Sequence, residues 1–178
     1  MTKFLLSLHV LAAVLTVGPV TVAASMFPRT LRRVHAEPGD PDALSTLRTL
    51  HRICRVYATI GLAVPVFGFA TASSLGVLRS PWLITAIVLT GIAAANLALL
   101  ILPAQDAVLT AVTRALEPAA AAEANPDARP EAAPVAVPLP VPGPQAAAQL
   151  AMLTGVFNLL WATVTVLMII RPGSTTGA

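Results

Sequence analysis

Four long runs of uncharged, mostly apolar residues divide this chain and limit what it can fold into. They cover residues 4–27, 56–78, 82–102 and 150–170, and none contains Asp, Glu, Lys or Arg. Each run has the roughly 20 residues that a helix needs to cross about 30 Å of hydrocarbon. Inside lipid, backbone N–H and C=O groups find partners only within their own segment, so each run is predicted to be a helix. A transmembrane β-barrel is disfavoured because its strands alternate apolar and polar residues, whereas these runs are continuous.

The overall composition also favours a membrane protein over a soluble domain. Hydrophobic residues make up 56% of the 178 residues and charged residues only 11%, whereas soluble domains carry about 25% charged residues. The net charge of +3 does not indicate a nucleic-acid partner, because six of the eleven basic residues lie in one segment between two apolar runs. The single cysteine, Cys54, excludes an intrachain disulfide and a metal cluster of cysteines. The predicted fold is an all-α integral membrane four-helix bundle with the lipid bilayer as its partner.

Basic residues are distributed unevenly between the two sides that the four runs define. Six arginines lie between the first two runs: Arg29, Arg32, Arg33, Arg48, Arg52 and Arg55. The segment after the third run adds Arg114 and Arg129, whereas the opposite side carries Lys3, Arg79 and Arg171. An excess of Lys and Arg marks the cytoplasmic side, so loops 28–55 and 103–149 are predicted to be cytoplasmic and both termini to lie outside. The six clustered arginines are also candidates for contact with anionic lipid headgroups.

The first apolar run is interpreted as an uncleaved span and not as a secretory signal. It extends from residue 4 to residue 27, whereas the apolar part of a signal peptide has about 7–15 residues, and arginines follow it directly. The chain has ten Arg but one Lys and is rich in alanine, which we interpret as a sign of a GC-rich bacterial genome. The predicted location is therefore a bacterial plasma (inner) membrane.

The predicted organisation places the first three spans and an amphipathic extension in residues 1–117. An Ala/Pro-rich linker follows at 118–149, then the fourth span at 150–170 and a disordered tail at 171–178. Residues 118–144 hold eight of the sixteen prolines, and such a composition cannot form a packed core, so this loop is predicted to be disordered.

Turn and capping residues predict how the spans are connected. A helical hairpin on the cytoplasmic side is expected between the first two spans, turning at 38–41, with Asp42 as the N-cap of the second helix. The third span is predicted to end near Pro103, where a short amphipathic helix begins. Pro19 and Pro65 are expected to bend the first and second spans.

His9 is the strongest candidate for chemistry, because it lies about 7.5 Å of helix rise beyond Phe4, inside the first span. Ionisable groups at membrane depth usually face the protein interior and are functional candidates by default. One interpretation is a neutral imidazole that bonds a neighbouring hydroxyl or amide and joins two helices. The other is a haem or metal ligand, since haem iron is commonly held by an axial His. His35 and His51 are predicted to be exposed at the opposite interface, which leaves two alternatives: His9 as a single ligand, or a second ligand from another subunit.

Asn96 and Asn158 are the other strongly polar residues at depth, and we expect them to join helices through hydrogen bonds. The spans contain no charged residue, which disfavours a proton-coupled transporter. The sequence has no nucleotide-binding loop, catalytic triad or zinc-protease motif. The residues therefore favour a protein that is not an enzyme and has no catalytic site.

The opening Phe4-Leu5-Leu6-Ser7-Leu8-His9-Val10-Leu11, followed by Val17-Gly18 and Phe27-Pro28-Arg29, resembles the start of a known family. That family comprises small bacterial four-helix proteins described as predicted integral membrane proteins of unknown function. A more distant similarity is to the copper-resistance protein D and four-helix protoporphyrinogen oxidase groups, which also place Leu-His early in span one. The resemblance implies a four-helix layout, and only His9 corresponds to the histidine thought to contact haem. Where those groups often have Trp and Gly-Gly, this chain has Thr16 and Gly18-Pro19.

Three functions follow as hypotheses. The first is a non-catalytic accessory or structural subunit of the plasma membrane, working with a membrane-protein partner or as a homo-oligomer and needing no cofactor. The second is a haem- or copper-handling redox protein that uses His9. The third is a small oligomeric transporter, although the spans lack the charged rings and interrupted half-helices usual in such proteins.

Overall fold

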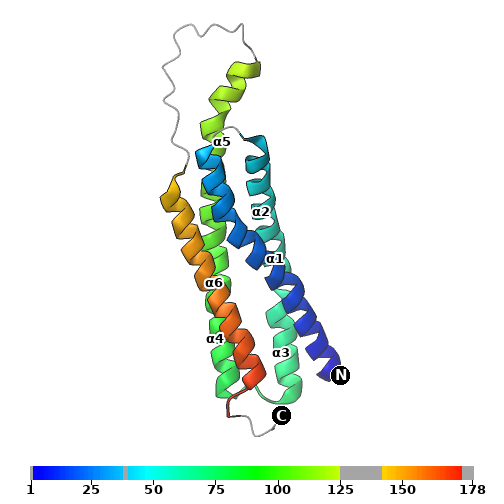
Figure 1. Cartoon of the computed structure of the whole chain (residues 1–178). Helices are drawn as coiled ribbons and strands as arrows, with labels where there is room; N and C mark the ends of the chain where they lie inside the picture. The colour runs from blue at the N-terminus through cyan, green and yellow to red at the C-terminus, as the bar shows by residue number, and fades with distance from the viewer. Residues whose placement is uncertain (1, 38–39, 125–141, 174–178) are drawn as a thin grey trace.

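The computed structural model describes residues 2–37, 40–124 and 142–173, and every regular element in these ranges is a helix (Figure 1). In chain order they are α1 (Thr2–Ala36), α2 (Pro41–Ile60), α3 (Ala63–Leu75), α4 (Pro81–Ala95), the π-helical segment η1 (Asn96–Ile101), α5 (Leu102–Ala124) and α6 (Pro144–Ile170). They form four rods, because α2 leads into α3 and α4 leads through η1 into α5. Each rod is long and apolar enough to cross a membrane. The prediction of an all-α chain with four such helices is confirmed.

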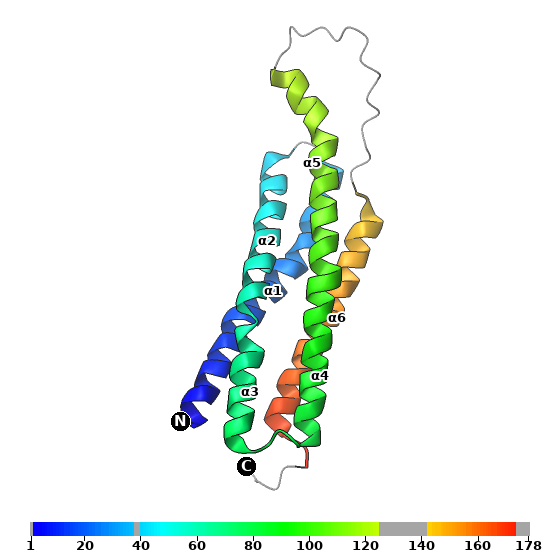
Figure 2. The ribbon, with the colours of Figure 1, turned by 180° about the vertical axis from the view of Figure 1, so that it is seen from behind.

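The four rods lie side by side in one elongated bundle (Figures 1 and 2). Helix α1 contacts α2, α3 and α6, and α5 contacts α2 and α6. Successive rods run in opposite directions, so the start of α1 and the end of α6 lie at one end of the bundle with the turn between α3 and α4 (Figure 1). The other end holds the α1–α2 connection, α5 and the start of α6. We call it the arginine end, because Arg29 to Arg55 lie there.

The second rod is interrupted at Gly61–Leu62, between α2 and α3. Pro65 has no N–H to donate to the carbonyl of Gly61 four residues earlier. The N–H of Val64 donates to that carbonyl instead, at 3.0 Å. A Cβ atom on residue 61 would lie 3.1 Å from the carbonyl oxygen of Tyr57, so glycine suits this tight turn. The interruption lies where Pro65 was expected to bend the second span.

The third rod continues through Pro103, near which the third span was predicted to end, so the span and the helix after it form one continuous rod. The π-helical segment η1 precedes this proline and leads directly into α5. A proline ring inside a regular α-helix clashes with the carbonyl four residues earlier, and a π-helical turn is wider than an α-helical one. The wider turn therefore lets the chain pass Pro103 without leaving the helix. The expected amphipathic helix is the continuation of this rod.

Asp40, and not Asp42 as predicted, is the N-cap of α2. Its carboxylate accepts from the backbone N–H of Asp42 at 3.0 Å and of Ala43 at 3.2 Å. Pro41 then occupies the first helical position, where its fixed φ fits and its missing N–H costs nothing. The other oxygen of Asp40 lies 2.9 Å from Nη2 of Arg33, which ties the end of α1 to the start of α2.

Helices extend into both ends of the range predicted as a linker. Helix α5 continues past Pro118 to Ala124, and α6 begins at Pro144, six residues before the expected start of the fourth span. Residues 125–141 of the predicted linker and residues 174–178 of the predicted tail lie outside the described residues.

The largest apolar core lies at the arginine end, where α1, α2, α5 and α6 meet. Its buried members are Ala23, Ala24, Phe27, Leu31, Val34, Ala43, Leu47, Leu50, Cys54, Val108, Val112, Ala147 and Leu150. A second cluster around Phe157 joins α1, α4, η1 and α6. A third around Trp82 closes the opposite end of the bundle. The rods therefore stay packed beyond the apolar runs, as helices of a water-soluble bundle do.

Candidate functional site

Exposed large apolar side chains form a belt around part of the bundle. In α1 they lie within residues 4–26, in the second rod within 56–78, in the third within 84–100 and in α6 within 152–170. Outside these four ranges, the described part of the arginine end has no exposed large apolar side chain. Residues 4–26 of a helix span about 33 Å, which matches the hydrocarbon thickness of a bilayer. We call this surface the apolar belt.

The arginines of the first connector begin where the apolar belt ends. All six are exposed: Arg29, Arg32, Arg33, Arg48, Arg52 and Arg55. Arg29 lies three residues beyond Met26, the last exposed large apolar residue of α1, and Arg55 directly precedes Val56, the first of α2. Two neighbouring helices thus change from apolar to basic at the same level of the bundle.

His9 is half-buried between α1 and α3, where its Nδ1 lies 2.9 Å from the carbonyl oxygen of Val64. A carbonyl oxygen only accepts, so Nδ1 carries the hydrogen and donates it. In a neutral imidazole, Nε2 is then the nitrogen with a free lone pair. Gly68 lies beside the ring, and a Cβ atom there would be 2.9 Å from Cε1 of His9. The predicted helix-joining bond is present, although its acceptor is a backbone carbonyl and not a hydroxyl or amide side chain.

Two polar side chains of α6 reach α1 one turn apart. The hydroxyl of Thr154 donates to the carbonyl of Ala24 at 3.5 Å. That carbonyl lacks its helical donor, because the residue four positions later is Pro28. Asn158 follows on the same side of α6, and its Nδ2 donates to the hydroxyl of Ser25 at 3.2 Å. The proline inside α1 thus creates an acceptor that α6 uses for docking.

Asn96 connects the third rod to α6 at the start of η1. It is buried, and its Nδ2 donates to the carbonyl of Leu153 at 2.9 Å. Its own Oδ1 is buried and has no hydrogen-bond partner among the described residues, and the same holds for Nε1 of Trp161. Asn96, Thr154 and Asn158 therefore form contacts from α6 to both α1 and η1.

His51 is buried, which makes the prediction of an exposed histidine wrong. Only 7% of its surface is exposed, because it packs between α2 and α5. Its Nδ1 lies 3.2 Å from Oε1 of Gln105, whose Nε2 contacts the sulfur of Cys54 at 3.8 Å. Nothing in the sequence indicated that His51 is buried, because its burial depends on a contact with Gln105 on another helix. His35 is exposed, as predicted.

Cys54 and Gln105 lie outside the apolar belt, in the core of the arginine end. Cys54 is fully buried. Burial raises the pKa of its thiol to about 11, and the hydrogen bond from Gln105 opposes this rise only in part. A thiol in this state is not a nucleophile near neutral pH. The lone cysteine is therefore a packing residue.

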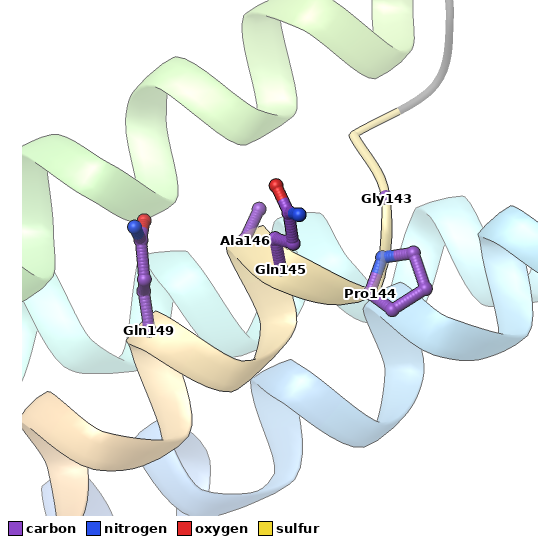
Figure 3. A pocket seen from close by; sticks show the side chains of 5 residues that line it. All are labelled: Gly143, Pro144, Gln145, Ala146 and Gln149. Carbon is purple, nitrogen blue, oxygen red and sulfur yellow. The ribbon is translucent and has the colours of Figure 1, made fainter.

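A shallow hollow of about 570 Å³ lies beside the start of α6 (Figure 3). It is lined by Gly143, Pro144, Gln145, Ala146 and Gln149. The side chains of Gln145 and Gln149 stand on the same side of α6 in this view. The hollow offers amide hydrogen bonds and no ionisable group.

Among the described residues, no three His, Cys, Asp or Glu side chains come together as metal ligands. No protein-family model, curated protein or solved structure matches this chain. The candidate site is therefore the set of polar contacts between helices, with His9 as its ionisable member. Sequence reasoning identified His9, Asn96 and Asn158, but it missed Thr154, Ser25 and Gly68. Pro28 was the available signal for Thr154, because it leaves a carbonyl free.

Proposed function

We propose that this chain is a multi-pass protein of a bacterial plasma membrane and acts as a structural or accessory subunit. The observation that carries this proposal is the apolar belt with arginines at one edge. A belt of this height fits the hydrocarbon layer, where water cannot compete for exposed apolar side chains. Arginine at the belt's edge fits the headgroup layer, where guanidinium groups reach lipid phosphates and water.

The arginine end is assigned to the cytoplasm. Seven arginines of the described residues, Arg114 among them, lie there, whereas the opposite end has Lys3, Arg79 and Arg171. Positive charge near span ends resists translocation, so the more basic end stays inside. This orientation places the α1–α2 hairpin and the extension of α5 in the cytoplasm and the start of α1 outside.

The structural role rests on how the polar groups at membrane depth are used. His9, Asn96 and Asn158 each donate a hydrogen bond to another helix. Such bonds contribute about 0.6–2 kcal/mol each inside a membrane and favour one arrangement of the helices. Side chains engaged in this way stabilise a defined bundle, which can then present a fixed surface to a membrane-protein partner or to a second copy of the chain.

Membrane insertion and orientation are tested together. Cys54→Ala removes the single buried thiol, and single cysteines are then introduced at the exposed positions Ser45 and Arg79. We expect an impermeant maleimide to label Ser45→Cys only from the cytoplasmic side and Arg79→Cys only from outside. Alkaline carbonate should leave the protein in the membrane. Labelling of both positions from one side, or release by carbonate, would contradict the proposal.

A second candidate is a haem- or copper-handling protein that uses His9. It is favoured by the bond from Nδ1 to Val64, which leaves Nε2 as the nitrogen able to bind a metal. Hydrogen bonding of one ring nitrogen to a carbonyl is the usual way to orient a metal-ligating histidine. His9 fits one axial position, and the second ligand would come from another subunit, since His35 lies about 39 Å further along α1. Bound haem or copper would supply electron transfer.

The visible spectrum of the purified protein separates the two candidates. The structural role predicts a colourless protein in which His9→Leu still inserts and folds. A Soret band that is lost in His9→Ala would establish the second candidate and remove the first. Copper that binds the wild-type protein at a fixed stoichiometry and does not bind His9→Ala would also establish the second candidate.

A further inference from the structure

Five of the six arginines at the belt's edge have no carboxylate within 4 Å among the described residues, and four of these also make no side-chain hydrogen bond there. Arg33 is paired with Asp40, and Nη2 of Arg48 lies 3.5 Å from the hydroxyl of Thr113. The four arginines with neither kind of partner are Arg29, Arg32, Arg52 and Arg55. Their positive charge is available to a ligand outside the chain.

These four arginines form two neighbouring pairs, Arg29 with Arg32 on α1 and Arg52 with Arg55 on α2. Residues three positions apart lie on the same side of a helix, with Cβ atoms about 5–6 Å apart. Like charges at this spacing repel each other and destabilise the helix. An anion between the two guanidinium groups would remove the repulsion, and a phosphate can accept from both of them.

The depth of the pairs matches the lipid headgroup layer. Along the helix axes, Arg29 lies about 4.5 Å beyond Met26, and Arg52 lies about 6 Å beyond Val56. The headgroup region adds roughly 5–8 Å to each side of the hydrocarbon core. The apolar belt directly below the pairs would contact the acyl chains of the same lipid. A phospholipid therefore fits both the arginine pairs, through its phosphate, and the apolar belt, through its acyl chains. A soluble phosphate fits the arginine pairs alone.

The opposite side of the bundle differs at the same level. On α5 the residue near the belt's edge is Asp106, which is exposed. On α6 the exposed polar residues near this level are Gln145 and Gln149, and the helix contains no charged residue from Pro144 to Ile170. Anion binding is therefore expected on α1 and α2 and not on α5 and α6.

We propose that the pairs Arg29–Arg32 and Arg52–Arg55 bind the phosphodiester headgroups of anionic phospholipids. This inference rests on the proposed insertion of the apolar belt into a membrane. It adds a preference for anionic over zwitterionic phospholipids, which insertion alone does not require. The headgroup of a zwitterionic lipid carries a positive charge that the arginines repel, whereas an anionic headgroup carries none.

The test uses the full chain in nanodiscs of equimolar phosphatidylcholine and phosphatidylglycerol, with the retained lipids counted by native mass spectrometry. We expect the wild type to retain phosphatidylglycerol in preference to phosphatidylcholine. Arg52→Gln with Arg55→Gln should weaken phosphatidylglycerol binding roughly thirtyfold. The matched control, Arg79→Gln with Arg171→Gln, removes two charges at the other end and should leave it unchanged.

Three outcomes would overturn the inference. The wild type could show no preference between the two lipids, or the control could lose phosphatidylglycerol as strongly as the test variant. Millimolar inorganic phosphate could also displace the lipid completely, which would make the pairs a site for soluble phosphate. Arg52→Lys with Arg55→Lys keeps the charge and should retain part of the preference, so misfolding of the Gln variant does not obscure the result. Failure to enter nanodiscs of either lipid would instead contradict the proposed function.

Discussion

The imidazole of His9 lies directly against Gly68, so that a Cβ atom at residue 68 would be only 2.9 Å from Cε1 and 3.1 Å from Nδ1 of the ring. Glycine therefore gives α1 and α3 the close approach that the bond from His9 to Val64 needs. Small residues serve this purpose widely in membrane helices. The histidine and the glycine act as one packing unit, although 59 positions separate them in the sequence.

Gly68→Ala should destabilise the protein by about 1–2 kcal/mol, as overpacking of a fixed contact does. The ring cannot move away without losing its hydrogen bond to Val64. Thermal unfolding in detergent, followed by circular dichroism, measures the change. Gly91→Ala is the matched control, because a Cβ atom there has nothing within 4 Å, and it should be neutral or slightly stabilising. The double variant His9→Ala with Gly68→Ala should be less destabilised than the sum of the two single variants. Additive destabilisation would show that the two residues are independent.

Thr154→Val should cost about 1 kcal/mol, because it leaves the carbonyl of Ala24 without a donor next to Pro28. The control is Thr163→Val, whose hydroxyl bonds the carbonyl of Leu159 in its own helix, where the backbone donor is retained. The same unfolding measurement applies to both variants. Equal effects would indicate that the hydroxyl of Thr154 contributes nothing to the docking of α6 on α1.

The sequence was sufficient to predict the four helices, because uncharged runs of this length have one stable form in lipid. It was not sufficient for their ends. The third span was expected to end near Pro103 and a short helix to follow, and only the three-dimensional structure shows that a π-helical turn joins the two into one rod. Asp42 was a reasonable N-cap by residue type, yet Asp40 is preferred because Pro41 fits the first helical position.

The candidate site was predictable only in part, for a related reason. A polar residue in an apolar run is visible in the sequence, so His9, Asn96 and Asn158 could be identified. Their acceptors were not visible, because two are backbone carbonyls, of Val64 and Leu153, on other helices. The burial of His51 likewise depends on how α2 turns toward α5, which helical spacing within α2 alone did not determine.

Cys54 should resist thiol reagents in the folded protein, since it is buried and its pKa is raised to about 11. A maleimide at pH 7.5 is expected to label it only after denaturation in SDS. Ser45→Cys in a Cys54→Ala background is the control, because position 45 is exposed on the same helix and should react at once. Rapid labelling of native wild-type protein would contradict the packing at the arginine end.

Acid should weaken the α1–α2 hairpin through Asp40. The pKa of this carboxyl lies below its ordinary value of 3.8, and the largest cause is the backbone hydrogen bond from Ala43. Desolvation opposes this lowering, but the hydrogen bond from Asp42 and the charge of Arg33 add to it. A carboxylate whose pKa is lowered by folding stabilises the native state fully above its unfolded value. That contribution is lost as the pH falls through the lowered pKa, so the effect lies below about pH 4.

Two substitutions at Asp40 separate the charge from the cap. Asp40→Asn keeps a side-chain oxygen for the N–H groups of the first turn, so it should unfold near the wild-type temperature at pH 7 and show a smaller loss on acidification to pH 3. Asp40→Ala removes the acceptor as well and should unfold at a lower temperature at both pH values. Asp42→Ala, which leaves the cap intact, should be less damaging at pH 7 than Asp40→Ala. If Asp42→Ala were more damaging than Asp40→Ala, Asp42 would be the N-cap. If acid destabilised Asp40→Asn as much as the wild type, another carboxylate would be responsible for the acid sensitivity.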